Sequence, residues 1–238
     1  MARDDTPLWL FADQLGPAVY GGEHAHREVL LVESSAALRK RRYHRQKLHL
    51  TLSALRHAER DLGERATLLH ADTYTDALRR FNRPVLVHEP TSHAAERFVY
   101  RLKDAGLVAD VLPTPTFALS RSGFAEWAGN RQRFRMEDFY RDQRRRFGVL
   151  MDGDDPVGNR WNYDEQNRES PPKNQSTLGV PAPYRPREDD IDEKVRADLD
   201  SMDLDTVGAD GPRLFAVTPV EAKRALTRFI DHRLASFG

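Results

Sequence analysis

Short apolar runs alternate with amphipathic segments through residues 8–115, and this alternation limits the folds open to the chain more than any other feature. Runs of about four to six apolar residues are typical of strands buried on both faces, whereas apolar residues at helical spacing indicate helices that cover a sheet. The alternation therefore predicts an α/β fold: a doubly wound, Rossmann-like parallel sheet of about five strands with flanking helices. The predicted strands are 8–12, 28–34, 66–71, 84–90 and 109–115, and the predicted helices are 43–62, 75–81 and 94–105.

The chain of 238 residues has no cysteine, and its 37 acidic residues balance 37 lysines and arginines. The lack of cysteine excludes disulfides, thiolate nucleophiles and cysteine-ligated metal clusters within this chain. Because the net charge is zero, any binding of nucleic acid must come from local basic clusters. No apolar run has the length of a membrane span and the first residues do not resemble a signal peptide, so we expect a soluble, cytoplasmic protein. We predict no metal site at His24 and His26, which lie in a surface connection.

Polar residues follow the apolar part of several predicted strands. Asp13 and Gln14 follow the first strand, and Glu33 lies at the end of the second. The carboxyl ends of parallel strands are the usual ligand site of an open α/β sheet, so we expect these residues to contact a ligand. No glycine-rich phosphate loop is present, so a dinucleotide or nucleoside triphosphate held in that way is not expected. The alternative is that strand ends are polar because they reach solvent.

Basic residues crowd the start of the helix predicted at 43–62. Cations at a helix N-terminus oppose the helix dipole, and an anionic ligand or a partner carboxylate nearby would offset this cost. We predict that His44 and Lys47 close the ligand site, and the alternative is an ordinary surface pair at a helix start. The basic residues of this segment are Arg39, Lys40, Arg41, Arg42, Arg45 and Lys47.

A basic and aromatic stretch, 131–150, predicts a helix that leads into a polar loop, 151–173. Its arginines have two candidate roles: contact with DNA phosphates, or fixing of the loop through Asp164 and Glu165 with Trp161 packed inward. The aspartates at 152, 154 and 155 are interpreted as a turn, because the further ligands of a calcium loop are absent. The candidate DNA-binding residues are Arg141, Arg144, Arg145 and Arg146.

The chain is predicted to have three parts: an α/β domain at 1–130, the basic helix with its loop at 131–185, and a linker with helices at 186–238. An acidic helix is expected within 188–205 and a terminal helix at 219–237. The terminal helix carries an apolar stripe that needs a surface to pack on, so we expect another domain, within the same protein or separate, to cover it.

Several motifs resemble the deoxyribodipyrimidine photolyase-related proteins, which are the iron–sulfur bacterial cryptochromes and (6-4) photolyases. The first set lies in the α/β part: Ala12-Asp13-Gln14-Leu15, Val32-Glu33, Tyr43-His44-Arg45-Gln46-Lys47 and Ser53-Ala54-Leu55-Arg56-His57-Ala58. The second set resembles the R-M-E-x-F-Y-R, W-N-[FY]-D and N-R motifs of the family. Its residues here include Met136, Glu137, Tyr140, Trp161, Asn162, Asp164 and Arg168, to which the resemblance gives a structural role.

The resemblance implies a two-part photoenzyme whose α/β domain binds a light-harvesting antenna. The antenna would be similar to 6,7-dimethyl-8-ribityllumazine, held by Asp13, Gln14, Glu33, His44 and Lys47. A helical domain would bind FAD and an iron–sulfur cluster, and the reduced flavin would repair a (6-4) photoproduct flipped out of UV-damaged DNA. The chain departs from the family pattern at Ala12, Ala37, Tyr43 and Asn159, which puts the identity of the antenna in doubt.

We therefore expect the chain to be the amino-terminal, antenna-domain portion of a photolyase- or cryptochrome-related flavoprotein, serving light-driven repair or blue-light sensing. Because the chain has no cysteine, we expect FAD and the iron–sulfur cluster only in a missing domain. The chain by itself would then not repair DNA, and no catalytic residue is assigned within it. The alternative is a stand-alone module that binds a nucleotide-like ligand, DNA or a protein partner without catalysis.

Overall fold

The computed structural model describes residues 5–163, 173–174 and 179–236 of the chain. The chain divides into two compact units. The first comprises the residues up to Ala118 together with Pro183–Asp231, and the second comprises Leu119–Ala182 with the residues from His232 onward. Across the described ranges, no helix combines the length and the apolar character that crossing a membrane requires.

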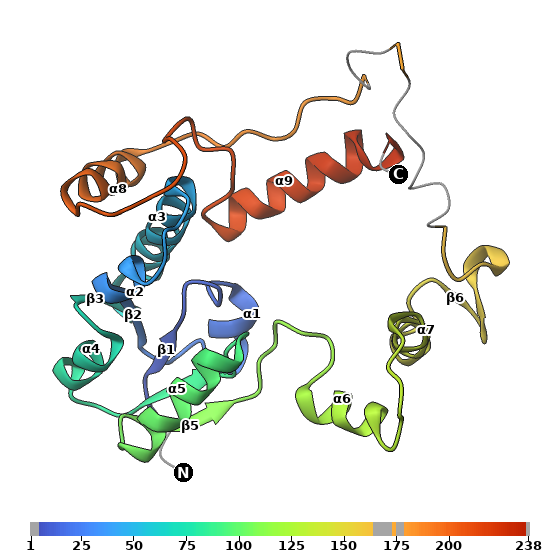
Figure 1. Cartoon of the computed structure of the whole chain (residues 1–238), viewed down its shortest axis with the longest axis horizontal. Coiled ribbons are helices and arrows are strands. Elements are labelled where there is room, and N and C mark those ends of the chain that lie inside the picture. Colours follow the sequence, from blue (N-terminus) through green and yellow to red (C-terminus); the bar gives the residue numbers. More distant parts are fainter. Residues whose placement is uncertain (1–4, 164–172, 175–178, 237–238) are drawn as a thin grey trace. The chain divides into compact units, whose positions relative to one another are not determined.

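The first unit is built on a five-stranded sheet with the order β3-β2-β1-β4-β5 (Figure 1). All neighbouring strands run parallel. From the central strand β1 the chain proceeds outward to β2 and β3 on one side, and then returns to place β4 and β5 on the other side of β1. The topological switch point therefore lies between β1 and β4. The predicted doubly wound, Rossmann-like α/β fold is confirmed. The strands are β1 (Leu8–Leu10), β2 (Val29–Ser34), β3 (Ala66–Ala71), β4 (Val85–His88) and β5 (Val108–Leu112).

Each face of the sheet has its own hydrophobic core. On one face Trp9, Leu30 and Val87 pack against α4 (Tyr74–Phe81) and α5 (His93–Asp104). On the other face lie Leu8 and Leu31, which pack beneath α1 (Pro17–Tyr20) and α3 (Arg45–Leu62). Successive side chains of a strand point to opposite faces, so a strand between two helical layers is apolar throughout. This explains the continuous apolar runs in the sequence.

Side-chain caps fix where several helices begin. Ser34 caps the short helix α2 (Ser35–Arg39), and Thr73 and Ser92 cap α4 and α5, each by accepting a hydrogen bond from a backbone N–H. The third helix, α3, begins at Arg45 rather than at residue 43, because the Nδ1 of His44 accepts a hydrogen bond from the N–H of Gln46. The capping residue has an extended backbone, so the helix begins at the residue that follows it.

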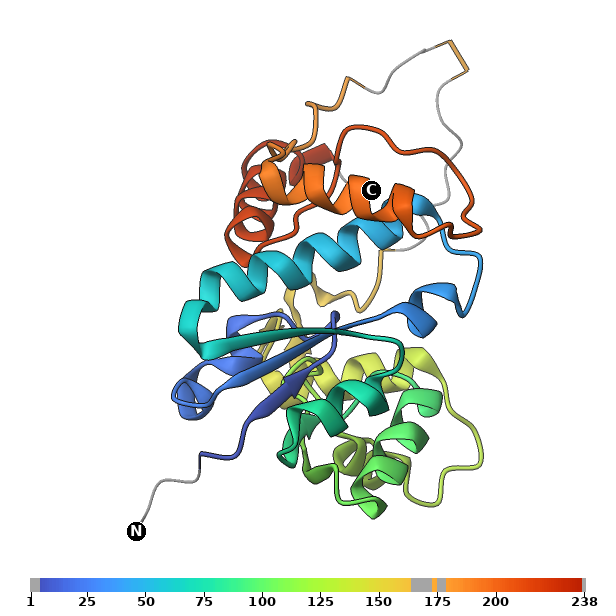
Figure 2. The ribbon, with the colours of Figure 1, turned by 90° about the vertical axis from the view of Figure 1, so that its left-hand side faces the viewer.

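A second helical layer lies on α3. Figure 2 shows α3 between the sheet and α8 (Asp190–Ser201). Leu48 and Leu52 of α3 pack against Ile191 and Val195 of α8, so α3 is covered on two sides. The last helix of this unit, α9 (Pro219–His232), is followed by a 3-10 turn (Leu234–Ser236).

The described residues of the second unit between 119 and 163 form two helices, a small hairpin and an aromatic cluster. Its elements are α6 (Arg121–Ala128), α7 (Met136–Phe147), β6 (Met151–Asp152), β7 (Asp155–Pro156) and a 3-10 turn (Val157–Asn159). The helix predicted at 131–150 is therefore shorter at both ends. The aspartates at 152, 154 and 155 lie in the hairpin, where Gly153 has the positive φ of 59° that a tight turn needs. Trp127 packs edge-on against Phe139, with ring centroids 4.9 Å apart.

Candidate functional site

A cavity of about 160 Å³ lies at the carboxyl end of β2, between α2 and the first turns of α3. It is called the α2–α3 cavity below. Its position agrees with the usual ligand site of an open α/β sheet, beyond the carboxyl ends of the strands. Its lining residues are Ala12, Val32, Glu33, Ser34, Ala37, Leu38, Tyr43, Lys47, Leu48, Thr51, Leu52, Leu55 and Tyr74.

Glu33 lines the α2–α3 cavity, but its carboxylate is already bound by side chains of the protein. Arg56 donates to both carboxylate oxygens, at 2.8 and 3.0 Å, and the Nδ1 of His70 lies 2.9 Å from Oε2. Glu33 is buried, and a buried carboxylate needs this kind of pairing to offset the loss of hydration. Its charge is therefore balanced before any ligand enters.

Lys47 is the second predicted residue that lines the cavity. Its side chain is exposed, and the ammonium lies 5.2 Å from the centre of the Tyr43 ring. Tyr74 lines the same cavity, and burial, followed by the nearby charge of Asp13, raises the pKa of its phenol. Tyr74 therefore stays protonated near neutral pH and can donate a hydrogen bond. The structure thus brings together Glu33 and Lys47 of the five residues predicted to hold an antenna.

Asp13 and Gln14 line a separate, larger hollow of about 530 Å³ in the same unit, near the start of α9. The Gln14 side chain is buried, and its amide donates to the carbonyl oxygens of His88 and Glu89, both at 3.3 Å. It therefore joins the ends of β1 and β4. The exposed carboxylate of Asp13 accepts a hydrogen bond from the hydroxyl of Thr91 at 2.8 Å. These two residues contact the neighbouring strand ends rather than the α2–α3 cavity.

His44 does not line the α2–α3 cavity. Its backbone pairs with Val207, and its ring lies against Gly208, where a Cβ atom would be only 2.0 Å from Nε2. Gly208 also has a φ of 72°, which favours glycine. His44 therefore caps α3 and packs on the segment that follows α8.

Charged and polar side chains join α3 to the segment 187–221. We call this set the α3–α8 network: His49, Ser53, Asp192, Arg213 and Glu221. Asp192 is fully buried and accepts hydrogen bonds from His49 Nε2 at 2.8 Å and from Ser53 Oγ at 3.2 Å. Arg213 Nε lies 3.1 Å from the same carboxylate, while its other nitrogens donate to both oxygens of Glu221 at 2.7 and 3.0 Å.

Burial by itself would raise the pKa of Asp192, and its partners reverse this effect. The hydrogen bond from His49, the backbone N–H of Asp189 and the charge of Arg213 together lower the pKa to about 2. The carboxylate is therefore ionised throughout the physiological range. Burying a charge without such partners would cost several kcal/mol, so each member of the network depends on the others.

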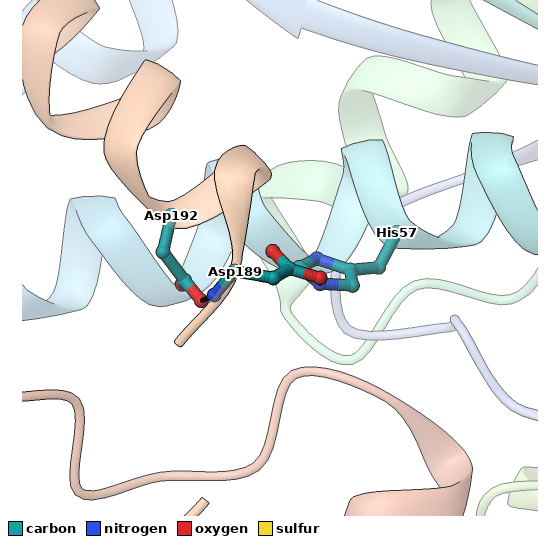
Figure 3. A group of neighbouring side chains, drawn as sticks. All are labelled: His57, Asp189 and Asp192. Atoms are coloured by element: carbon teal, nitrogen blue, oxygen red, sulfur yellow. Dashed lines mark hydrogen bonds and ion pairs between the residues drawn. The ribbon is translucent and has the colours of Figure 1, made fainter. Parts of the chain in front are cut away.

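Three residues of this region have the composition of a metal site: His57, Asp189 and Asp192. Their ligand atoms lie within 4.8 Å of one another, and Figure 3 shows the Asp189 carboxylate facing the His57 ring. Arg60 contacts Asp189 at 2.8 Å, however, and Arg213 contacts Asp192. A divalent cation would have to displace two guanidinium groups, so the donor set fits a hydrogen-bonded network better than a metal centre.

In the second unit, Trp161 lies beside three of the arginines of α7. The guanidinium carbons of Arg141, Arg144 and Arg145 are 5.4, 5.2 and 4.7 Å from the centre of its ring. Arg144 is buried and donates to the carbonyl oxygens of Val149 and Leu150. Arg144 therefore faces the protein.

The other arginines of α7 differ in exposure. Arg141 pairs with Glu137 one helical turn away, whereas Arg145 and Arg146 are exposed to solvent. A hollow of about 780 Å³ next to α7 is lined by the remaining residues of the family motif that the structure describes, namely Met136, Glu137, Tyr140, Trp161 and Asn162, with others. Asp164 and Arg168 lie outside the described residues.

Sequence reasoning did not find the α3–α8 network. Its signal is the spacing of His49 and Ser53, which are four residues apart and so lie on one face of α3, where His57 continues the polar stripe. A polar stripe beside the apolar residues of a helix indicates that a second element covers it. The partner residues Asp192 and Arg213 have no such local signal. Sequence reasoning also missed Tyr74, which lines the α2–α3 cavity. Tyr74 lies on α4, whereas the ligand site was predicted from residues at the strand ends and at the start of α3.

The comparisons with known proteins agree with the motifs. The sequence model of the family described as deoxyribodipyrimidine photo-lyase-related protein matches residues 8–214. A (6-4) photolyase of Agrobacterium fabrum (strain C58 / ATCC 33970) is 31% identical over a 248-residue alignment that covers 96% of this chain and 48% of that protein. Uncharacterized protein R852 of Acanthamoeba polyphaga mimivirus is 33% identical over a 63-residue alignment that covers 25% of this chain and 32% of that protein. The chain spans about half the length of the (6-4) photolyase.

Proposed function

Because the chain belongs to the deoxyribodipyrimidine photo-lyase-related protein family, we propose that it is the antenna-type part of a photolyase- or cryptochrome-like flavoprotein. The function of this part is to hold a planar chromophore, lumazine-like or flavin-like, in the α2–α3 cavity. The observation that carries the proposal is the position of this cavity. It lies at the carboxyl end of β2 and contains both Glu33 and Lys47.

The cavity offers a planar ring an apolar floor and polar edges. The floor consists of Val32, Leu38, Leu48, Leu52 and Leu55. The ring edge would meet the protonated phenol of Tyr74, which can donate a hydrogen bond to a ring carbonyl oxygen. Small side chains at Ala12 and Ala37 leave the space open. An enclosed ring is kept from water, which favours the transfer of excitation energy over quenching by solvent.

The flavin chemistry of the proposed whole protein needs groups that this chain does not contain. The chain has no cysteine, so it offers no thiolate for an iron–sulfur cluster, which would have to be held by other residues than these. On α9, Leu226 and Ile230 are 58% and 51% exposed, while Phe229 is half-buried. This apolar side supports our proposal that an FAD-binding domain packs on α9. Repair of (6-4) photoproducts in UV-damaged DNA would require that domain.

The proposal is tested by titrating the purified chain with riboflavin and with 6,7-dimethyl-8-ribityllumazine, followed by the fluorescence of each ring. We expect saturable binding by at least one of them, and loss of that binding in Ala37→Trp, because the indole would fill the cavity. Ala36→Trp is the matched control, since Ala36 is exposed and does not line the cavity. If neither of these chromophores nor a phosphorylated flavin binds, or if Ala37→Trp binds as well as the unchanged chain, the cavity is not an antenna site.

A second function, contact with DNA, is supported by the surface of α7. Arg145 and Arg146 are exposed and adjacent, and phosphate contacts typically come from such arginines. We propose that these two residues contact DNA phosphates in the whole protein, while Arg144 fixes the loop around Trp161. Arg145→Gln with Arg146→Gln should weaken duplex binding about tenfold and reduce its salt dependence by about two charges. Arg79→Gln with Arg80→Gln, on α4 of the other unit, is the control, and equal losses in both pairs would contradict the proposal.

A further inference from the structure

The lining of the α2–α3 cavity has an unbalanced charge. Glu33 is buried and bound by Arg56 and His70, so it has no charge left to offer a ligand. Lys47 is exposed, and its contact is the ring of Tyr43. Among the described residues, no carboxylate forms an ion pair with Lys47. An ammonium without a counter-charge at the edge of an apolar cavity favours a ligand that carries an anionic group.

The chain beside the cavity adds further positive charge. Residues 39–42 connect Leu38 to Tyr43, both of which line the cavity, so this basic segment borders its mouth. The side chains at 39, 40 and 41 are exposed, and Arg42 pairs with Asp205 at 2.8 Å. The opposing carboxylates among the described residues include Asp13, which accepts a hydrogen bond from Thr91, and Asp72, which accepts one from the Ser35 hydroxyl at the start of α2. Basic groups therefore outnumber acidic groups at the mouth.

The size of the cavity separates the ring of a ligand from its tail. Its volume of about 160 Å³ is well below the roughly 300–1,000 Å³ of pockets that enclose a whole drug-sized ligand. The apolar floor suits a ring, whereas a polar or charged tail would extend outward. The tail would then lie at the mouth, beside Lys47 and the segment 39–42.

We propose that the α2–α3 cavity selects a planar ring with an anionic tail, a phosphorylated flavin rather than an unphosphorylated ribityl chromophore, and that Lys47 determines this preference. The inference rests on the proposed function of the same cavity, since it specifies which class of chromophore that cavity takes. Of the basic residues in the first turn of α3, Arg45 is already paired with Asp200 and Asp210. Lys47 is therefore the cation of this turn whose unfavourable interaction with the helix dipole the anionic tail would offset.

The experiment compares flavin mononucleotide with riboflavin, which share the ring and the ribityl chain and differ only in the phosphate. Each is titrated into the full chain, and quenching of flavin fluorescence gives the dissociation constant. We expect flavin mononucleotide to bind about tenfold more tightly, as a charge-assisted contact at a partly exposed site would give. The preference should decrease at high salt, because the mouth is open to solvent.

Variants assign the preference to Lys47. Lys47→Gln should bring the two affinities within about twofold of each other, and Lys47→Arg should keep most of the difference because the charge remains. Lys223→Gln is the matched control, since Lys223 is exposed on α9 and does not line the cavity. Circular dichroism of each variant establishes that the fold is unchanged.

The outcomes distinguish this inference from the proposed function. Equal affinity for both flavins, or tighter binding of riboflavin or of 6,7-dimethyl-8-ribityllumazine, overturns the preference for a phosphate while the cavity remains a chromophore site. A preference that persists in Lys47→Gln overturns the role of Lys47. If none of the three compounds binds, both the inference and the proposed function are wrong. These comparisons use the unchanged chain first, so they do not depend on any variant folding.

Discussion

The central sheet and the α3–α8 interface lie on either side of the same helix but are stabilised by different forces. The sheet side is apolar: Leu8, Leu31 and Leu86 pack beneath Leu55 of α3. The α8 side combines a small apolar cluster with buried charges, of which Asp192 and Arg213 are the centre. Hydrophobic packing has no preferred direction and tolerates a similar side chain, whereas a buried ion pair requires both partners in place.

This difference has two consequences for the protein. The two apolar clusters on the faces of the sheet should contribute stability that depends little on pH, because they consist of uncharged side chains. The α3–α8 interface should weaken when its carboxylates are protonated. The interface also positions Glu33, because Arg56 joins that carboxylate to Asp198 of α8. Substitutions that disrupt the α3–α8 interface should therefore also disturb the position of Glu33 in the candidate chromophore cavity.

The largest effect is expected from Asp192→Ala, which leaves the buried guanidinium of Arg213 without this carboxylate and His49 without its acceptor. Removal of one partner of a buried pair typically costs about 3–5 kcal/mol of unfolding free energy. Urea denaturation followed by circular dichroism measures the loss. Asp192→Asn, which keeps the shape and removes the charge, should lose less. A loss below about 1 kcal/mol in the alanine variant would mean that the network contributes little.

Leu30→Ala tests the apolar side of the comparison. Leu30 is fully buried in β2, and truncation of such a leucine costs about 3 kcal/mol through lost transfer energy and an unfilled cavity. The loss should be the same at pH 7 and pH 5, since the described residues that form a cluster with Leu30 are apolar. Urea denaturation at both pH values provides the measurement, and a loss that changes with pH would contradict the proposed contrast.

Acid should weaken the α3–α8 interface over a defined range. The pKa of Asp192 is about 2 in the folded chain, against about 3.9 in an unfolded one. A lowered pKa gives stability that is fully present above pH 4 and is lost as the pH falls towards 2, about 2–3 kcal/mol for this residue. Asp189, Asp210 and Glu221 have lowered pKa values as well and act in the same direction.

This prediction is checked by comparing the unfolding free energy at pH 5 and pH 2.5 in the unchanged chain and in Asp192→Asn. The variant should lose less stability on acidification, because one of the titrating groups has been removed. Identical losses in the two proteins would show that Asp192 is not responsible for the acid sensitivity.

The smallest effect is expected from Arg42→Ala. This change removes a surface ion pair between the residues that precede α3 and the residues that follow α8. Arg42 and Asp205 have side chains that are 62% and 78% exposed. Such pairs are screened by water and salt, so the loss should be within about 0.5 kcal/mol and should vanish in 1 M salt. Urea denaturation at low and high salt gives the comparison. A loss near that of Asp192→Ala would mean that burial does not distinguish the two pairs.

Periodicity was enough to predict the sheet, because each strand and helix of the α/β unit buries a face whose apolar spacing is visible locally. The five strands lie where the apolar runs predicted them, to within a few residues. Helix ends were less well predicted. The start of α3 depends on His44 acting as a cap, and 131–135 is not helical although its composition resembles that of α7.

The candidate site was predicted only in part. Glu33 and Lys47 lie together because the end of β2 meets the first turn of α3, which the order of the elements implies. Asp13 and Gln14 lie at a separate hollow, since the chain turns after Leu10 and joins β1 to β4. The bond between Glu33 and Arg56 joins residues 23 positions apart, and their pairing depends on the face that α3 turns to the sheet.

The sequence by itself determined the fold class and the family, because both are encoded in local spacing and in contiguous motifs. Only the tertiary structure decided which charges are balanced. Glu33 is bound by Arg56 and His70, Asp192 is bound by Arg213, and Lys47 has no carboxylate partner among the described residues. Charge balance depends on distances between side chains of different elements, and no pattern along a single segment contains that information.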